Sequence, residues 1–301
     1  MTVLYNPHAG GPSEAVAEAA RARDGATAVE LGDAAEAVGE AAARGERLIV
    51  AAGGDGTVRA VAAALLALGG TAETRPALGV APLGTGNDFA RALGVPRDLT
   101  PAAVLDLLAV GERRAVDAIR VTSGGAETLA MNAVTGGFSV EAGEAMSDGL
   151  KDALGPWAYV VGAARALPSL AREHRVRVVC DGGETAEAAV AAVGVANGQS
   201  VGGGTRIAPA ASLEDGRLDV VLARAEGPLD AVLTASWAAL AGAPVEGDGR
   251  ILHLQSARVE VTSEPPLRYS VDGELGLEGD AVFEAVPGAL RAVVGPGYAA
   301  G

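Results

Sequence analysis

The sequence holds a single cysteine among its 301 residues, Cys180. One thiol allows no disulfide within the chain and no zinc site built from several cysteines. Aromatic residues are also scarce, at 3% of the chain, whereas glycine occurs 43 times. Such a supply of small side chains favours helices that pack closely on sheets. With 301 residues, 49% of them hydrophobic, the chain can bury one large core or two modest ones, and we predict a globular protein with two domains.

Positive charge is in short supply as well. The chain has 23 lysine and arginine residues against 38 aspartate and glutamate residues, for a net charge of −15. Binding to nucleic acid requires many cations to neutralise phosphates, so we expect no nucleic-acid partner. A local basic stretch, which is usually a solvated face but could also contact lipid head groups, contains Arg165, Arg172, His174, Arg175 and Arg177.

Long apolar runs are missing too. No segment approaches the roughly eighteen uninterrupted apolar residues that cross a membrane as a helix. The start of the chain, Thr2 to Tyr5, has the pattern of a strand rather than the basic start of a signal peptide. We therefore predict a cytoplasmic protein with no transmembrane segment.

Short apolar runs alternate with amphipathic stretches in the first third of the chain. This β-α-β-α-β order predicts a Rossmann-like parallel sheet covered by helices. Predicted strands are 3–5, 28–30, 48–52 and 77–81, and predicted helices are 13–23, 34–43, 57–68, 87–93 and 100–110.

The pattern changes near Val116 to strand-like runs typical of an antiparallel, sandwich-like sheet. We thus predict an α/β protein with a parallel-sheet domain at 1–116 and a β-rich domain at 117–288, with 289–301 returning to the first. The predicted strands of the second domain are 119–121, 129–134, 176–180, 190–195, 218–223 and 257–262, and its predicted helices are 157–170 and 229–240.

The most informative motif is the run Gly53, Gly54, Asp55, Gly56 and Thr57, between a predicted strand and a predicted helix. A turn without side chains lets backbone amides approach a polyphosphate, and the helix that follows adds its positive dipole end. Asp55 stands where a carboxylate can hold a metal or a proton. The alternative interpretation is a plain tight turn with Asp55 as a helix cap.

Two further loops follow predicted parallel strands. Asn6 ends the first strand, and Gly84, Thr85, Gly86 and Asn87 follow the strand 77–81. Ligands of open α/β sheets bind at the carboxyl ends of the strands, so these loops and the first glycine motif predict one crevice.

The second domain carries two acidic turns. Asp215 precedes a glycine and could bind a hard cation together with backbone carbonyls, although an ordinary Asp-Gly turn has the same sequence. Asp272 and Glu274 flank Gly273 in a predicted hairpin turn that carries two carboxylates. Turns often have this composition.

Together these motifs resemble the diacylglycerol kinase catalytic-domain family, in particular the bacterial lipid kinases related to sphingosine kinases. The resemblance spans nearly the whole chain and implies an ATP-dependent kinase with its active site in a cleft between two domains. The implied reaction transfers the γ-phosphate of ATP to a lipid hydroxyl, most simply diacylglycerol, which gives phosphatidic acid for phospholipid biosynthesis. The motifs, in order, are Asn6-Pro7, Gly53 to Thr57, Gly84 to Arg91, Asn132 to Phe138, Asn197 to Gly204, Pro209 to Gly216 and Asp272 to Glu274.

The resemblance also implies roles for single residues. Magnesium would be organised through water by Asp55 and Asp88, and a structural magnesium would lie at Asp215 with the carbonyls of Leu213 and Leu218. The ATP phosphates and their polar contacts would fall on Asn6, Gly53, Gly54, Gly56, Thr57, Gly84, Thr85, Gly86 and Asn87.

For the general base, the family offers two carboxylates. Asp272 matches the position proposed in bacterial lipid kinases, with Glu274 near the metal, whereas sphingosine-type relatives use the aspartate of the glycine motif, here Asp55. The sequence does not separate the two. Likeness to the family also favours a homodimer.

The chain departs from the family pattern at Arg59 and Ala60, where relatives carry an Asn-Glu pair on the nucleotide helix. The segment 138–141 also lacks the acidic residue expected directly after the aromatic. Two alternatives therefore stay open: an NAD kinase, and a nucleotide-binding pseudokinase or regulatory protein.

Overall fold

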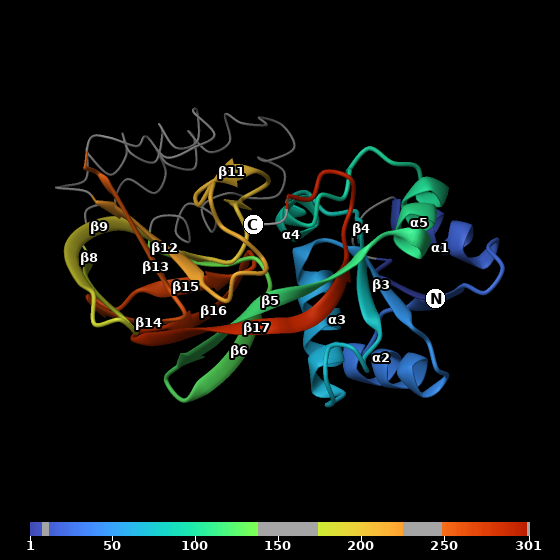
Figure 1. Cartoon of the computed structure of the whole chain (residues 1–301), viewed down its shortest axis with the longest axis horizontal. Helices are drawn as coiled ribbons and strands as arrows, with labels where there is room; N and C mark the ends of the chain where they lie inside the picture. The colour runs from blue at the N-terminus through green and yellow to red at the C-terminus, as the bar shows by residue number, and fades with distance from the viewer. Residues whose placement is uncertain (8–11, 138–173, 225–248, 300–301) are drawn as a thin grey trace. The chain divides into compact units, whose positions relative to one another are not determined.

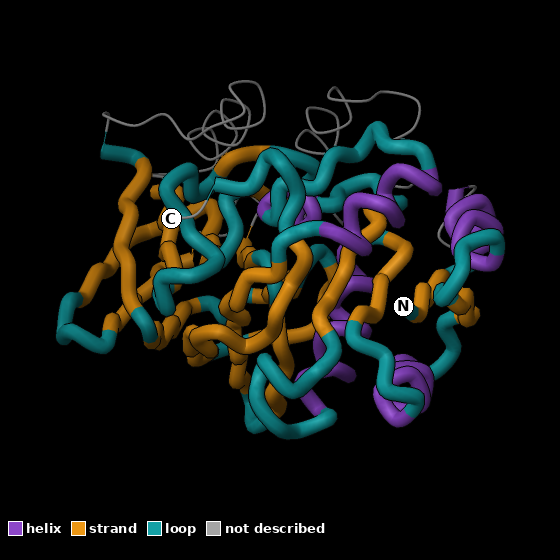
Figure 2. The backbone as a smooth tube through the Cα atoms, turned by 45° about the vertical axis from the view of Figure 1, so that its right-hand side comes forward, coloured by secondary structure: helices purple, strands orange, loops and turns teal. Residues whose placement is uncertain are grey.

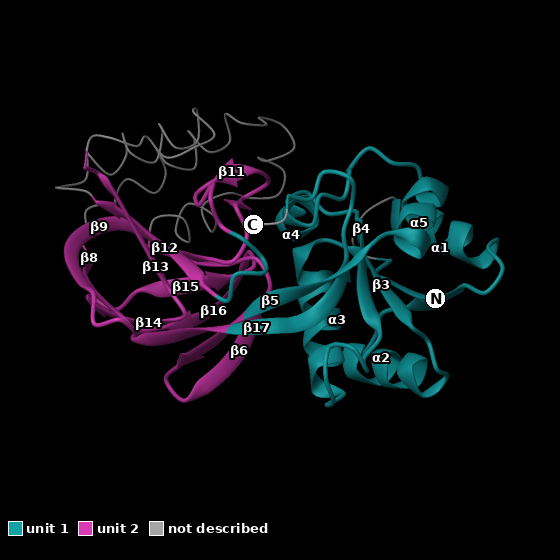
Figure 3. Ribbon diagram, viewed as in Figure 1, with its two compact units in different colours: residues 1–118, 212–216, 286–301 teal, residues 119–211, 217–285 magenta. Residues whose placement is uncertain are grey.

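The computed structural model describes residues 1–7, 12–137, 174–224 and 249–299. Figure 1 shows the course of the whole chain. The chain divides into two compact units, coloured separately in Figure 3. Unit 1 comprises Met1–Ala118, Ser212–Gly216 and Val286–Gly301, and unit 2 comprises Ile119–Ala211 and Arg217–Ala285.

Unit 1 is built on a parallel sheet in the order β2, β1, β3, β4. The last part of β17 continues this sheet, because Ala292 pairs in parallel with Leu78 of β4. β3 is buried along its whole length, as expected for a strand with both faces of its sheet covered. The bounds are β1 Thr2–Tyr5, β2 Thr27–Glu30, β3 Leu48–Gly53, β4 Ala77–Pro82 and β17 Ala281–Val293.

All helices of the described residues belong to unit 1 and stand out in purple in Figure 2. α1 contacts α5, and α2 contacts α3. The N-terminus of α2 is capped by Asp33, whose carboxylate accepts the N–H of Glu36, and Thr100 caps α5 in the same way. The bounds are α1 Pro12–Arg21, α2 Ala34–Ala43, α3 Asp55–Ala67, α4 Asp88–Ala92 and α5 Pro101–Val110.

Unit 2 is an antiparallel structure whose main path runs β16, β15, β7, β9, β8, β14 and β17. β12 pairs with β9 and with β13, and β5 pairs with β6. Its strands are β6 Ala126–Ala130, β7 Ala133–Gly137, β8 His174–Cys180, β9 Thr185–Ala196, β10 Ser200–Val201, β11 Thr205–Arg206, β12 Leu218–Arg224, β13 Ile251–Ser256, β14 Arg258–Glu264, β15 Arg268–Val271 and β16 Glu274–Glu278, together with the first part of β17 and the last part of β5, whose bounds are Arg113–Ser123.

The core of unit 2 is made mostly of valine and leucine, with two aromatic side chains among them. Tyr269 and Phe283 meet edge to face, with ring centroids 5.7 Å apart. The fold class predicted from the sequence, a parallel α/β part followed by a β-rich part, is therefore confirmed.

One predicted strand is wrong. The sequence favours a single strand over 129–134, but the structure ends β6 at Ala130 and starts β7 at Ala133. The backbone N–H groups of Met131, Asn132 and Ala133 all donate to the carboxylate of Asp272 instead of to a neighbouring strand. The predicted helices at 157–170 and 229–240 lie outside the described residues.

Asp117 joins the three chain segments of unit 1. Its carboxylate accepts the N–H of Gly216 and the N–H of Gly288, both at 2.7 Å, and its own N–H donates to the carbonyl of Leu213 at 2.7 Å. The side chain is buried, at 1% exposure, and burial raises its pKa above the ordinary value. The sequence analysis passed over this residue except as a domain boundary.

We predict that Asp117→Asn destabilises the protein. An asparagine has one acceptor oxygen, so its NH2 group would face one of the two N–H donors that the carboxylate now satisfies. The expected loss is about 1–3 kcal/mol in the free energy of unfolding. Urea denaturation measures it, with Asp98→Asn, which changes an exposed carboxylate, as the matched control. Equal midpoints for the two variants would contradict the role given to Asp117.

Candidate active site

The two glycine loops of unit 1 lie in direct backbone contact. They follow β3 and β4, which are neighbouring parallel strands. A Cβ atom on Gly84 would lie 2.6 Å from the Cα of Gly54, closer than real atoms come. Only glycine at these positions allows the approach, and it leaves two stretches of backbone free of side chains side by side. Such a surface fits a polyphosphate, which backbone amides can reach closely.

The second loop is shaped by Asn87, which has a left-handed backbone with φ of 52°. Its side-chain oxygen accepts the N–H of Gly84 at 2.9 Å, and its NH2 group donates to the carbonyl of the same residue. Arg97 donates to the carbonyl of Thr85 at 3.1 Å. Asn87 is buried, so it fixes the loop through these contacts, and the direct nucleotide contact expected of it stays a prediction.

Asp55 begins α3 and reaches across to α4. Its carboxylate accepts the N–H of Asp88 and the N–H of Phe89, both at 3.3 Å. Burial raises the pKa of Asp55, and the nearby negative charge of Asp88 adds to the shift. The structure thus brings together the two carboxylates that the sequence assigned to magnesium.

The carboxylate of Asp88 is itself buried and has Arg91 as a distant ion-pair partner, with 3.8 Å between Nε and Oδ1. Among the described residues, no three histidine, cysteine or acidic side chains gather in a preformed metal cage. Magnesium commonly binds through one or two carboxylates, with water and substrate phosphates as its other ligands. The Asp55 and Asp88 pair, beside the glycine loops, fits that donor set.

Two other residues belong to the predicted nucleotide site, Thr57 and Asn6. Thr57 is buried in the first turn of α3, and its side chain lies against Gly53. Asn6 directly follows β1. On the same helix, Arg59 and Ala60 are half-buried. The roles of Asn6 and Thr57 toward a nucleotide stay predictions.

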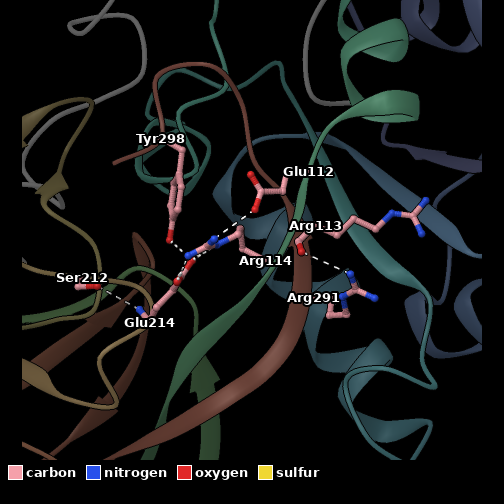
Figure 4. A network of polar contacts seen from close by, with 7 residues as sticks. All are labelled: Glu112, Arg113, Arg114, Ser212, Glu214, Arg291 and Tyr298. Atoms are coloured by element: carbon pink, nitrogen blue, oxygen red, sulfur yellow. Dashed lines mark hydrogen bonds and ion pairs between the residues drawn. The ribbon is translucent and has the colours of Figure 1, made fainter. Parts of the chain in front are cut away.

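The loop that carries Asp215 is held by an arginine–glutamate fork (Figure 4). Arg114 donates through Nε and Nη2 to the two carboxylate oxygens of Glu214, at 2.9 and 2.7 Å. Tyr298 adds a third donor to Glu214, at 2.7 Å, and Arg114 also pairs with Glu112 at 3.1 Å. Arg114 lowers the pKa of Glu214, so this carboxylate is ionised at neutral pH.

Asp215 itself is exposed at the tip of this loop. The carbonyl of Leu213 already accepts the N–H of Asp117, and Leu218 is the buried first residue of β12. The magnesium site predicted from these three residues stays a prediction. The sequence analysis missed Arg114, Glu214 and Tyr298, because the partners in this network are 84 and 100 residues apart and no local pattern joins them.

The second predicted acidic turn is a two-residue hairpin in unit 2. Asp272 and Gly273 form the turn between β15 and β16, and both have positive φ, of 48° and 89°. Positive φ at both central residues is typical of the primed turns that close two-residue β-hairpins. The buried carboxylate of Asp272 accepts three backbone N–H groups at 2.7 to 3.0 Å, whereas Glu274 is exposed at the start of β16. The structure therefore places Asp272 in a rigid setting.

Several expectations concern residues outside the described part of the chain or near its limits. Phe138 and the basic residues Arg165 and Arg172 lie outside the described residues. Of the remaining basic stretch, Arg177 pairs with Glu187 at 3.2 Å. No described helix is long and apolar enough to span a membrane.

Comparison with known proteins assigns the chain to a family. The model of the diacylglycerol kinase catalytic domain matches residues 1–121, and the model of the YegS C-terminal NAD kinase beta sandwich-like domain matches residues 132–294. The chain therefore belongs to the diacylglycerol kinase-like enzymes.

Within that family, the chain belongs to the YegS-like lipid kinases. It is 35% identical over 268 residues to "Probable lipid kinase YegS-like" of Xanthomonas euvesicatoria pv. vesicatoria, which covers 87% of this chain and 83% of the relative. The protein of the same name from Pseudomonas savastanoi pv. phaseolicola is 38% identical over 262 residues, with 87% and 80% covered.

A solved structure supports the same assignment. A "putative diacylglycerol kinase" from Bacillus anthracis str. Sterne matches with a TM-score of 0.76 and 25% identity, over 99% of this chain and 98% of that one. The prediction of the family is confirmed, and with it a kinase of the lipid-kinase class.

We predict that Gly84→Ala disrupts nucleotide binding. The new methyl group would meet the backbone of Gly54, so one of the two glycine loops must move. A strained or overpacked site of this kind costs about 1–3 kcal/mol, and ATP binding is expected to weaken on the order of tenfold or more.

The matched control is Gly39→Ala in α2. A Cβ atom there meets nothing within 4 Å, and alanine favours a helix over glycine by about 1 kcal/mol. Isothermal titration with ATP and thermal unfolding measure both variants. Unchanged ATP affinity in Gly84→Ala would argue against the glycine loops as the phosphate site.

Proposed function

We propose that the protein is an ATP-dependent lipid kinase that transfers the γ-phosphoryl group of ATP to the hydroxyl of diacylglycerol, giving phosphatidic acid. The observation that carries this proposal is the backbone contact between Gly54 and Gly84 beside the carboxylates of Asp55 and Asp88. Membership of the lipid-kinase family supports the acceptor class.

ATP would bind with its phosphates on the two glycine loops. The backbone at Gly53, Gly54, Gly56 and Gly84 to Gly86 would line the phosphates, with Thr57 and Asn6 as polar contacts. The N–H of Gly84 itself donates to Asn87, so it shapes the loop. The N-terminus of α3 adds its dipole, since the helix runs over 13 residues from Asp55. Bound MgATP supplies the phosphoryl group and the positive charge that balances its oxygens. Asp55 and Asp88 would hold the cation, through water.

Transfer requires a hydroxyl that loses its proton as it attacks. The oxygen of the acceptor forms a bond to the γ-phosphorus, the bond from that phosphorus to the bridging oxygen breaks, and the proton goes to a carboxylate. We propose Asp272 as this base, with Glu274 near the metal. The Asp272 Oδ1 accepts two N–H groups and Oδ2 accepts one, so Oδ2 would take the proton. Asp55 is the rival base.

The remaining roles follow the family likeness. Asp215, with the carbonyls of Leu213 and Leu218, would hold a structural magnesium. The protein would work in the cytoplasm, meet its lipid at the membrane surface through transient association, and form a homodimer.

The test is transfer of radiolabelled phosphate from ATP and magnesium to lipids in mixed micelles. We expect label in diacylglycerol and not in ceramide, sphingosine, phosphatidylglycerol or NAD. Asp55→Asn and Asp272→Asn should each lower the rate, and the variant that removes the base should cost about 10²- to 10⁴-fold in kcat.

Asp98→Asn, in the exposed loop after α4, is the control and should keep the full rate. Label in NAD alone would establish an NAD kinase instead. ATP binding without transfer to any acceptor would support the pseudokinase. A full rate in both Asp55→Asn and Asp272→Asn would remove both candidate bases.

A further inference from the structure

The C-terminal segment 294–298 lies against the end of α4. The N–H of Gly295 donates to the carbonyl of Leu93 at 2.8 Å, and the N–H of Gly297 donates to the carbonyl of Gly94 at 3.2 Å. Gly94 has a left-handed φ of 68°, and a Cβ atom there would collide with the backbone of Gly297 and Tyr298. The two stretches of backbone are therefore in contact with no side chain between them.

The same segment ends on the loop 212–216. The hydroxyl of Tyr298 donates to Glu214, whose carboxylate also accepts two hydrogen bonds from Arg114 (Figure 4). Burial raises the pKa of Tyr298, and Glu214 raises it further, so the hydroxyl keeps its proton and remains a donor at neutral pH. Glu214 directly precedes Asp215 in the sequence.

The helix α4 is held at both ends. Asp55 accepts the N–H groups of Asp88 and Phe89 at its start, and segment 294–298 binds the carbonyls of Leu93 and Gly94 at its finish. The helix is only five residues long. A shift at one end of so short an element therefore reaches the other end.

We infer that segment 294–298 is a strap that joins α4 to the loop 212–216, with Tyr298 as the positioning residue that fastens it. All of these contacts lie within unit 1. The functional meaning of the strap rests on the proposed function, because α4 carries Asp88 and the loop carries Asp215, the residues proposed for two magnesium ions. The strap itself rests only on the contacts.

The test is hydrogen–deuterium exchange of the metal-free full chain, wild type against Tyr298→Phe. The variant keeps the ring and removes one hydrogen bond to a charged group. Such a bond is worth enough that local opening should increase on the order of tenfold. We expect faster exchange at both ends of the strap, at the amide of Gly216 and at the amides of Gly295 and Gly297.

Tyr5→Phe is the matched control. It removes the hydroxyl that accepts Arg21 at 3.0 Å, elsewhere in the same unit, and should leave these three amides unchanged. Arg114→Lys keeps the positive charge but cannot donate two parallel hydrogen bonds to Glu214. It should therefore speed exchange at the same amides as Tyr298→Phe does. Exchange in Tyr298→Phe equal to that in wild type at either end would overturn the strap.

A second arm adds magnesium and separates the strap from the proposed function. In wild type, magnesium at Asp215 should slow exchange at Gly216 and, through the strap, at Gly295. In Tyr298→Phe the slowing should stop at Gly216. Both proteins carry Asp88→Asn in this arm, so that magnesium does not reach Gly295 through the proposed site at the start of α4. Equal slowing of Gly295 in both would then overturn the strap, whereas the absence of any magnesium effect on Gly216 would overturn the proposed metal at Asp215 alone.

Discussion

The carboxylate of Asp117 is the contact on which the organisation of unit 1 depends. It holds the N–H of Gly216, 99 residues away, and the N–H of Gly288, 171 residues away. Closing such long loops costs conformational entropy, although each doubling of loop length adds only about 0.6 kcal/mol. The buried carboxylate accepts two short hydrogen bonds from backbone N–H groups, and these offset part of this cost. They fix the positions of β5, the loop 212–216 and β17 relative to one another within unit 1.

The carboxylates of the proposed metal pair differ from two buried carboxylates that are held by backbone N–H groups. Asp117 and Asp272 are surrounded by backbone N–H groups, which compensate a buried negative charge without a metal. Asp55 and Asp88 lie beside each other; burial raises the pKa of Asp55, and the charge of Asp88 adds to the shift. A bound cation relieves the repulsion between two neighbouring carboxylates, and this supports the proposal that magnesium binds at Asp55 and Asp88.

Whether a structural feature can be predicted from the sequence depends on how far apart in the chain the interacting residues are. The glycine loops, the Asp-Gly turn at 272–273 and the parallel order of β1 to β4 follow from neighbouring residues, so residue type and period predict them. The break at Met131 arises from a side chain about 140 residues away, and the Arg114 fork closes over 100 residues. No local pattern records such a partner, which is why a strand was expected over 129–134 and why Glu214 went unnoticed beside Asp215.

The departure at Arg59 and Ala60 bears on whether the chain is an active kinase. Both residues follow the first turn of α3, on a helix whose Val58 and Val61 are buried in unit 1. The geometry that the proposed chemistry requires lies at the start of that helix. There Asp55 accepts the N–H groups of Asp88 and Phe89, and Gly54 contacts Gly84. The residues at positions 59 and 60 can alter the affinity for a nucleotide. They leave the carboxylate pair and the backbone surface in place, which favours a working enzyme over a pseudokinase.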